Sequence, residues 1–488
     1  MAQHFPLLQV EANGLTGPLA PVMGDETSKH PVLPKALGNL CRLMPSRRVE
    51  LLGIACRVDD DGLFRAEPTG LLAKKVGWRI VDGIVNAVNN KGWPIVRRDG
   101  QLIFTMYQPA IPSAPAMKVL ASRMVHEKTG HPRAATATLQ ITARCQADCH
   151  HCSAARHKYR FKPELTTEQW KSILRQTEDL GVVNIVFTGG EPLLRRDVFE
   201  LITWVRKDES NAMMFTNGLL LTEQNVKKLV DAGLFSLNVS IDRPNPESHN
   251  ELRKVPRCFE RALEGLRRAR DAGLIVGIST YATPERLRNG QVMEMIKLAR
   301  QVGAHEITVF DVVPTGKLLL EDAASLLSDD DKEELMRIEE EWNAGREHPH
   351  VITQAHVNGP KGAGCYAGWF QFYMTAYGDM MPCDFTPLTV GNTPKESVET
   401  LWNRLAEHPA YAVHCNHCRM QDASFRAKYI DRIPDEGPFP FPIAELANLW
   451  AENTREGYPA QDSPSIPRPS VGDDPALKHG SNLVRKAR

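Results

Sequence analysis

The sequence predicts an α/β protein in which parallel strands alternate with helices. From about residue 135, six short β-rich runs each precede a stretch whose apolar residues recur at helical spacing. A strand followed by a helix, repeated along the chain, is typical of a parallel sheet or barrel. The six runs are Thr138–Thr142, Asn184–Thr188, Ala212–Thr216, Phe235–Ile241, Val276–Tyr281 and Glu306–Val312.

Helical periodicity is clearest in two stretches between these runs. Residues Thr167–Leu180 and Cys258–Ala272 each carry apolar residues on one face. Thr167 is a favourable N-cap residue, but Trp170 three positions later gives no capping box. Residues 328–345 are strongly acidic, which predicts a solvated helix that connects the repeat region to the rest of the chain.

The first 115 residues predict a small domain in front of the repeats. Residues 1–45 form an irregular arm, and residues 46–115 form a winged-helix-like α+β domain. We expect a strand at Leu51–Val58 and an amphipathic helix over residues 71–89. A hairpin around Asp99-Gly100 is expected to join Pro94–Arg98 to Gln101–Tyr107. The prolines Pro109, Pro112 and Pro115 then predict a linker.

Composition excludes several classes of function. The 488 residues include 59 basic and 59 acidic side chains, so no net charge favours nucleic acid. No apolar run is long enough for a transmembrane helix, and no signal-peptide pattern is present, so we expect a cytoplasmic protein. Contact with a membrane surface stays open, because the helix expected at 71–89 carries Lys74, Lys75 and Arg79 beside its apolar face. From about residue 462 the tail is Pro/Ser-rich and is expected to be disordered.

Seven of the ten cysteines fall into two local groups. A disulfide framework suits short secreted chains, whereas clustered cysteines in a cytosolic chain indicate metal binding. The other three, Cys41, Cys56 and Cys258, stand alone in apolar surroundings and are expected in the core.

The first group, Cys145, Cys149 and Cys152, has the spacing C-x3-C-x2-C directly after the first predicted strand. Three thiolates on one loop can hold an iron–sulfur cluster with one iron left open to a small molecule. The alternatives are three thiols without metal, or zinc with a fourth ligand from His150, His151 or His157.

The second predicted strand ends in Gly189-Gly190-Glu191-Pro192, one strand–helix unit after the cysteine triplet. Together these motifs resemble the radical S-adenosylmethionine (SAM) superfamily. The branch they resemble holds the molybdenum-cofactor and pyrroloquinoline-quinone biosynthesis enzymes and the sulfatase-maturing enzymes. Further matches follow in order over residues 135–320, at Thr216-Asn217-Gly218, Ser240-Ile241-Asp242, His249–Arg253, Phe259 and Pro314-Thr315-Gly316. One departure is His151, where an aromatic residue is usual.

The resemblance implies a partial (β/α)6 TIM-like barrel over residues 130–325, with the small N-terminal α+β domain before it. It implies that the first three cysteines bind a 4Fe-4S cluster. The SAM ligands it implies are Gly189, Gly190, Glu191 and Pro192 for the amino group, and Asn217, Ser240 and Asp242 for other polar contacts. Arg253 can pair with the SAM carboxylate, or instead form a surface ion pair with Glu251.

The second group consists of Cys365, a Gly378-x4-Cys383 motif, Cys415 and Cys418. Four thiolates suffice for a closed cluster, and the pattern resembles the twitch or SPASM-type auxiliary domains of this branch. We therefore predict a C-terminal iron–sulfur domain over residues 361–425, with one auxiliary cluster, expected to be 4Fe-4S. A structural zinc ion is the alternative. Residues 326–360 form the connection, and residues 426–488 a C-terminal extension.

The implied reaction is reductive cleavage of SAM to a 5′-deoxyadenosyl radical, which then removes a hydrogen atom from a substrate. An electron donor such as flavodoxin or ferredoxin is needed. The first hypothesis for the substrate is a peptide or protein side chain, and the second is a small molecule such as a cofactor precursor or a lipid. A third hypothesis is a non-catalytic binding protein stapled by metal. Tyr281 and Asp311, at the ends of the fifth and sixth strands, are candidates for contact with the substrate.

Overall fold

The computed structural model describes residues 41–44, 48–51, 54–59, 63–68, 92–157, 162–319 and 326–446. The helix expected at 71–89, most of the expected N-terminal arm and the tail from residue 462 lie outside these residues. Among the described residues no helix is long and apolar enough to cross a membrane.

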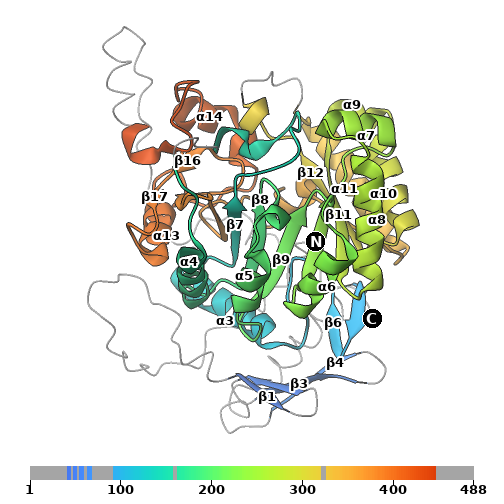
Figure 1. Ribbon diagram of the computed structural model, residues 1–488. Helices are drawn as coiled ribbons and strands as arrows, with labels where there is room; N and C mark the ends of the chain where they lie inside the picture. The colour runs from blue at the N-terminus through green and yellow to red at the C-terminus, as the bar shows by residue number, and fades with distance from the viewer. Residues whose placement is uncertain are drawn as a thin grey trace, which may run out of the picture. The chain divides into compact units, whose positions relative to one another are not determined.

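A ten-stranded sheet forms the centre of the fold (Figure 1), in the order β13-β12-β11-β10-β9-β8-β7-β14-β15-β17. Each pair of neighbours from β13 to β14 is parallel. The six predicted strands are all present: β7 Thr136–Thr142, β8 Asn184–Gly189, β9 Asn211–Thr216, β10 Ser236–Ser240, β11 Ile275–Ala282 and β12 Glu306–Asp311.

Two parallel strands were not predicted. Strand β13 (His350–Thr353) extends the sheet beyond β12, and β14 (Gln371–Met374) extends it beyond β7. Both are four residues long. Strand β13 follows the predicted acidic helix, and β14 follows the segment that carries Cys365. Too few residues are present for a periodic signal.

The sheet curves into a partial barrel. The rings of Phe215 on β9 and Phe310 on β12 lie 6.4 Å apart, although two strands separate β9 from β12 in the sheet. Such a contact requires the sheet to bend until both side chains point into the same interior space. The α/β fold with a barrel-like sheet is therefore as predicted.

Amphipathic helices follow most of the parallel strands and pack their apolar residues against the sheet. In α8, for example, Cys258, Ala262, Leu266 and Ala269 are completely buried. The helices of the barrel are α4 Thr167–Asp179, α5 Val198–Trp204, α6 Glu223–Asp231, α7 Pro246–Arg253, α8 Cys258–Asp271, α9 Pro284–Arg288, α10 Gln291–Val302, α11 Asp329–Ala344 and α12 Gln354–Val357.

Two expectations about these helices were wrong. Thr166, not Thr167, is the N-cap of α4, and Gln169 completes a capping box with it. Thr166 and Thr167 are both good cap types, so the sequence alone did not fix the register. The acidic helix α11 is not solvated all round, because Leu335, Met336 and Glu339 are buried.

The N-terminal region forms an antiparallel sheet in the order β1-β2-β3-β4, with β1 Cys41–Met44, β2 Arg48–Leu51, β3 Ile54–Val58 and β4 Phe64–Pro68. The expected strand at Leu51–Val58 is thus divided between β2 and β3. The expected hairpin is present as β5 Val96–Arg98 and β6 Gln101–Ile103. Asp99 and Gly100 both take positive φ, as a tight two-residue turn requires.

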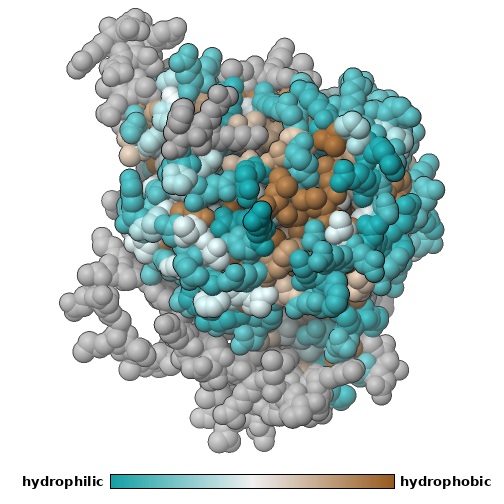
Figure 2. All heavy atoms as spheres, viewed as in Figure 1, coloured by the Kyte–Doolittle hydropathy of each residue, from teal (hydrophilic) through white to brown (hydrophobic). Residues whose placement is uncertain are grey.

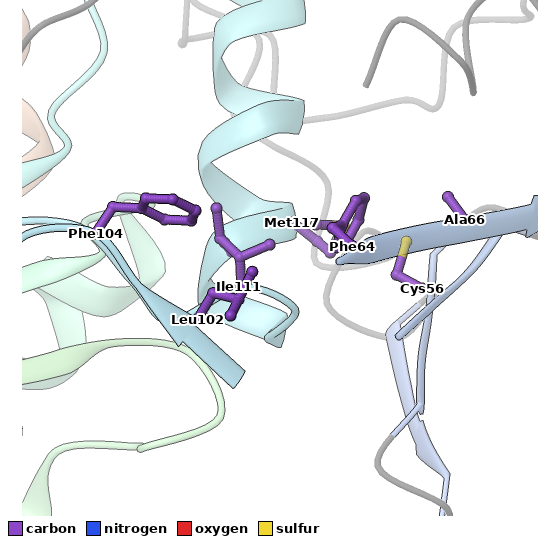
Figure 3. Packing of buried hydrophobic residues seen from close by; sticks show 8 residues of the cluster. Cys56, Phe64, Ala66, Leu102, Phe104, Ile111 and Met117 are labelled. Carbon is purple, nitrogen blue, oxygen red and sulfur yellow. The ribbon is translucent and has the colours of Figure 1, made fainter. Parts of the chain in front are cut away.

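The three prolines do not mark a linker. Ile111 pairs with Leu102, and Pro115 lies in the first turn of helix α3 (Ala114–Thr129), where proline is favourable. Figure 3 shows how α3 and the hairpin pack onto the N-terminal sheet. The residues of this small core are Cys56, Phe64, Ala66, Leu102, Phe104, Ile111, Ala116 and Met117. Cys56 is a core residue, as predicted.

After the hairpin, the chain reaches the amino end of the barrel strands. The hydroxyl groups of Tyr107 and Thr308 on β12 share a hydrogen bond (3.0 Å). The Tyr107 hydroxyl also accepts a hydrogen bond from Asn238 on β10 (3.3 Å). The Met106 amide donates to Glu306 at the start of β12 (3.3 Å). The segment thus fills the barrel floor and leaves the opposite end of the strands for a site.

The C-terminal part continues from the central sheet. Strand β15 (Asp379–Met381) turns back on β14, and β17 (Gly391–Asn392) pairs with β15. Strand β16 (Leu388–Thr389) pairs with β18 (Phe441–Pro442). Helices α13 (Val398–Glu407) and α14 (Ala423–Tyr429) flank the segment that carries Cys415 and Cys418.

Candidate active site

The first cysteine group lies on the loop that follows β7, at the carboxyl end of the barrel strands. Cys149 is buried and Cys145 and Cys152 are half-buried. Burial raises the pKa of Cys145 and of Cys149, and Cys152 raises both further, as Cys149 does for Cys145, so the three sulfurs lie within electrostatic reach of one another. The loop therefore brings the three predicted ligands together.

The two glycines after β8 let this loop lie close to the neighbouring strand. A Cβ on Gly190 would stand 2.2 Å from the Arg144 carbonyl oxygen, and one on Gly189 would stand 2.5 Å from the Thr142 carbonyl oxygen. The Gly190 amide donates to Thr142 (2.7 Å) and the Glu191 amide to Arg144 (2.8 Å). Only glycine fits here, and the reason in this structure is contact with the cysteine loop.

Glu191 is completely buried and already has several partners. Its carboxylate accepts hydrogen bonds from the Leu193 amide (3.1 Å), the Thr216 hydroxyl (2.8 Å) and the Asn217 amide (2.8 Å). Burial raises its pKa to about 7. Glu191 thus ties the end of β8 to the end of β9, and three bonds leave room for one further donor on the carboxylate. Pro192 follows it in the first turn of a short 3-10 helix, Pro192–Leu194.

Asn217 and Ser240 stand at the ends of the next two strands. The Asn217 amide group lies 3.9 Å from the Cys145 sulfur, and its oxygen accepts from Gln146 on the cysteine loop (3.3 Å). Ser240 accepts a hydrogen bond from Ser279 (3.2 Å) and is partly exposed. Asn217 therefore lies against the cysteine loop, and Ser240 contacts Ser279 on the neighbouring strand β11.

Asp242 and Arg253 form a buried ion pair, with 2.5 Å between a guanidinium nitrogen and a carboxylate oxygen. Arg253 also reaches the Cys149 sulfur (3.6 Å), and its Nε has no hydrogen-bond partner. The guanidinium holds the pKa of Asp242 well below its usual range. Arg253 is thus not on the surface with Glu251, and it lies beside the cysteine loop.

Two histidines complete this buried group. His151 lies 3.4 Å from the Asp242 carboxylate, and His249 accepts a hydrogen bond from the Asp242 amide (3.2 Å). Burial lowers the pKa of each to about 4, so both are neutral at pH 7. His151 packs on the Tyr281 ring with 4.7 Å between centroids, which is how it occupies the usual aromatic position.

The two candidates for substrate contact have different surroundings. Tyr281 on β11 is partly exposed and lies opposite Phe310 in the strand register. Asp311 is buried, and burial raises its pKa to about 6. Hydrogen bonds from Gln421 and the Ala355 amide oppose this rise. Asp311 also raises the pKa of Cys418. Asp311 therefore joins β12 to α12 and the second cysteine group. Tyr281 instead lies near the first cysteine group, through its contact with His151.

Apolar and polar side chains share the barrel interior. Phe215, Phe310 and Tyr281 keep partial exposure, as do Thr188 and Ser240. Figure 2 shows a hydrophobic patch over the strands of the central sheet, surrounded by hydrophilic residues. The interior suits a substrate with an apolar portion.

The second cysteine group also comes together. Burial raises the pKa of Cys383, to about 12, and also those of Cys415 and Cys418. The nearby Cys365 thiol raises all three further. The Cys365 amide donates to the Cys415 carbonyl (2.7 Å). Gly378 takes a φ of +88°, and a Cβ there would stand 2.0 Å from the Thr393 carbonyl oxygen, which explains the glycine of the Gly378-x4-Cys383 motif.

The Pro314-Thr315-Gly316 loop connects the two groups. The Lys317 amide donates to the Cys152 carbonyl (3.1 Å), and a Cβ on Gly316 would stand 2.1 Å from that same oxygen. The Thr315 hydroxyl donates to the Phe385 carbonyl (2.7 Å), two residues after Cys383. One loop after β12 therefore contacts both cysteine-bearing segments.

Three- and four-thiolate sets of this kind fit iron–sulfur clusters. Among the described residues, no three His, Cys, Asp or Glu side chains are gathered as the ligands of one metal ion would be. Cysteines of a cluster bind different iron atoms and need not lie that close. A cluster on the first set would have one iron left for another ligand, and Asn217 and Arg253 lie beside the sulfurs of Cys145 and Cys149.

Models of two known families match the chain. The radical SAM superfamily matches residues 139–286, and SPASM, an iron–sulfur cluster-binding domain, matches residues 365–419. The chain contains a radical SAM domain followed by a SPASM domain. These domains imply a 4Fe-4S cluster, SAM and further iron–sulfur binding.

Curated relatives are enzymes. The AdoMet-dependent heme synthase of Nitratidesulfovibrio vulgaris is 27% identical over 300 residues, which are 57% of this chain and 81% of the relative. The PqqA peptide cyclase of Gluconobacter oxydans is 28% identical over 272 residues, which are 54% of this chain and 75% of the relative. The protein is a radical SAM enzyme, and the hypothesis of a non-catalytic binding protein is set aside.

Sequence reasoning missed three residues of this site. Arg243 and Arg286 stand beside Tyr281, and the buried Cys258 thiol lies near Cys149 and Arg253. None belongs to a motif with a fixed spacing. Their only signal was position, because Arg243 and Arg286 each follow the end of a predicted strand.

Proposed function

We propose that this enzyme removes a hydrogen atom from a peptide or protein side chain held in the barrel interior. When bound, the first cluster and SAM supply a 5′-deoxyadenosyl radical for this step. The observation that carries the proposal is the arrangement of the carboxyl ends of the strands. There the cysteine loop and the polar groups on β9 and β10 face one interior space with Phe215, Tyr281 and Phe310.

The chain's own residues have separate tasks in this proposal. Cys145, Cys149 and Cys152 bind the first cluster, and Gly189, Gly190 and Glu191 contact the SAM amino group. Asn217, Ser240 and Asp242 supply further polar contacts to SAM. Arg253 holds Asp242 in place and lies beside Cys149, so it supports the cluster loop as well as the SAM site.

The second cysteine group serves in electron transfer. Cys365, Cys383, Cys415 and Cys418 are four thiolates, which leave no iron of a 4Fe-4S cluster open. A closed cluster in contact with the barrel through the Pro314-Thr315-Gly316 loop is suited to accept an electron from the substrate. The first cluster receives its electron from a donor such as flavodoxin or ferredoxin.

Two observations support a peptide substrate. The PqqA peptide cyclases are relatives over 75–80% of their own length in the cases from Gluconobacter oxydans and Rhizobium meliloti. In addition, β4 is an edge strand of the N-terminal sheet, and an edge strand can pair with an extended peptide. That sheet packs on the hairpin whose chain continues to the barrel floor.

The similarity to AdoMet-dependent heme synthases favours a second candidate, a small biosynthetic molecule such as a cofactor precursor. The two candidates share the radical step and differ only in what occupies the interior.

Isotope transfer distinguishes them. Bacterial extract from cells grown in heavy water is separated into polypeptides and small molecules, and each fraction is added to reconstituted enzyme with SAM and reductant. Deuterium in 5′-deoxyadenosine from the polypeptide fraction alone is expected. Transfer only from the small-molecule fraction would overturn the peptide proposal. A Cys145/Cys149/Cys152→Ala variant is the control and is expected to form no 5′-deoxyadenosine.

A further inference from the structure

Two arginines lie beside the Tyr281 ring at the ends of β10 and β11. The guanidinium carbon of Arg286, on α9, is 4.8 Å from the ring centroid, and that of Arg243 is 5.4 Å from it. Arg243 donates to the Asp242 carbonyl (3.2 Å), and Arg286 donates to the carbonyls of Tyr281 and Asp242. Both guanidinium groups are thus held beside one aromatic ring.

Neither cation forms an ion pair with a carboxylate in the part of the chain that the structure describes. The nearby Asp242 carboxylate is ion-paired with Arg253 and lies against His151. Three guanidinium groups, those of Arg243, Arg253 and Arg286, therefore lie around one carboxylate here.

The burial of Arg286 makes this imbalance informative. The residue is only 3% exposed, and its Nε, which can donate a hydrogen bond, has no partner. Buried charges in proteins are normally paired, because removal of an ion from water is costly. Burial and the neighbouring Arg243 lower the pKa of Arg286 to about 10, in line with a cation that lacks its anion.

We propose that Arg243, supported by the charge of the buried Arg286, binds a carboxylate group of the substrate beside the Tyr281 ring. The substrate is then a peptide segment or small molecule that carries a carboxylate on an apolar body. Guanidinium groups are well suited to this role, since they bind carboxylates through paired hydrogen bonds. The apolar body would lie against Tyr281 and Phe310, which are opposite each other in the strand register. This inference rests on the function proposed above.

SAM does not account for both arginines. SAM brings a single carboxylate, and its pairing with one guanidinium would leave the other without an anion. The partly exposed Arg243 is the one accessible to a second ligand, whereas Arg286 contributes mainly its charge and its fixed position.

The test uses a matched pair of small probes with the full-length, reconstituted and SAM-loaded enzyme. 3-Phenylpropionate and its neutral amide, 3-phenylpropanamide, are titrated by calorimetry without oxygen. The acid is expected to bind at least about tenfold more tightly than the amide, because a hydrogen bond to a charged group is stronger than a neutral one. Equal affinities, or no binding of the acid, would overturn the proposal.

Variants assign the effect to the arginines. Arg243→Gln is expected to remove the preference for the acid, and Arg243→Lys to keep part of it, since Lys retains the charge but not the planar fork. Arg267→Gln, on the exposed side of α8, is the matched control and leaves both affinities unchanged. A loss of SAM affinity in Arg243→Gln, with the acid preference intact, would assign this arginine to SAM instead.

The same samples separate this proposal from the proposed function. Wild-type enzyme that forms no 5′-deoxyadenosine would contradict the radical chemistry, whatever the probes do. Wild-type enzyme that cleaves SAM but binds acid and amide equally would contradict only the carboxylate site. Competition with acetyl-Ala-Glu-Ala-amide then shows the source of the carboxylate. Displacement of 3-phenylpropionate by this peptide identifies a peptide side chain, and failure to displace it identifies a small acid.

Discussion

The two cysteine groups differ in number, position and neighbours. The first has three cysteines on one loop at the carboxyl end of the barrel, with Asn217 and Arg253 close to the sulfurs. The second has four cysteines from three separate segments, and burial strongly raises the thiol pKa of Cys383. A three-thiolate set surrounded by polar donors is suited to bind and activate a ligand. A four-thiolate set is suited to hold a closed cluster, so the proposed function gives the two groups separate roles in one reaction.

Loss of the second group should have the largest selective effect. In a Cys383→Ala/Cys418→Ala variant we expect about four irons per chain to be lost, because half of a four-thiolate set is gone. Substrate conversion should be abolished while SAM cleavage persists. Iron analysis and chromatography of 5′-deoxyadenosine and product check this. Equal loss of SAM cleavage would contradict separate roles for the two groups.

The buried ion pair beside the first group should be next in effect. Asp242→Asn leaves the Arg253 cation without its partner, and breaking a buried pair costs about 3–5 kcal/mol. Chemical denaturation of the apoprotein measures the loss in free energy of unfolding. Glu251→Gln, on the exposed side of α7, is the control. A change below about 1 kcal/mol would show that the pair is dispensable.

His157, which follows the first group, should make stability depend on pH. Burial lowers its pKa from 6.5 to about 4, so between these values the unfolded state binds a proton that the folded state does not. Its contribution to the free energy of unfolding therefore falls by up to about 3 kcal/mol as pH drops from 6.5 to 4. His157→Phe should flatten the measured curve in this window. An unchanged slope would mean that His157 takes up protons in the folded state.

Gly190 should affect the first group alone. In Gly190→Ala the new methyl group would meet the Arg144 carbonyl, so the cysteine loop must shift. A displacement near 1 Å at a reacting centre lowers rate by about 100-fold. We expect SAM cleavage to fall by about that factor, while the second cluster keeps its spectroscopic signal. Gly345→Ala controls for the general effect of the substitution, because Gly345 has a φ of −69° and the nearest atom to its Cβ would be 3.4 Å away. Loss of both clusters would show a global defect.

The parts predicted from sequence were those with a local pattern. The six strands around which the barrel forms were predicted because each is a short run rich in β-forming residues and precedes a stretch with helical periodicity. The hairpin was predicted because Asp-Gly favours one turn type. Strands β13 and β14 escaped prediction because each has only four residues, too few for a periodic signal. Pro115 shows another limit, since proline suits both a linker and the first turn of a helix.

At the site, motifs indicated the residues but not always their surroundings. The glycines after β8 were expected to admit a ligand, and in the structure they admit the cysteine loop. Asp311, predicted as a candidate for contact with the substrate, lies near Cys418 of the second cysteine group. Arg286 and the link from Gly316 to Cys152 depend on contacts between segments far apart in the chain. The spacing of residues within a motif cannot predict such contacts. The roles assigned to individual site residues stay predictions until variants are measured.

The most direct test of two clusters with separate roles is a count of iron and zinc in anaerobically reconstituted protein. It is made on wild type, on the Cys145/Cys149/Cys152→Ala variant and on a Cys365/Cys383/Cys415/Cys418→Ala variant, with 5′-deoxyadenosine formation assayed in each. We predict about eight irons in wild type and about four in each variant, with SAM cleavage lost only when the first group is removed. Zinc in place of iron in either group, or SAM cleavage that survives loss of the first group, would contradict this account.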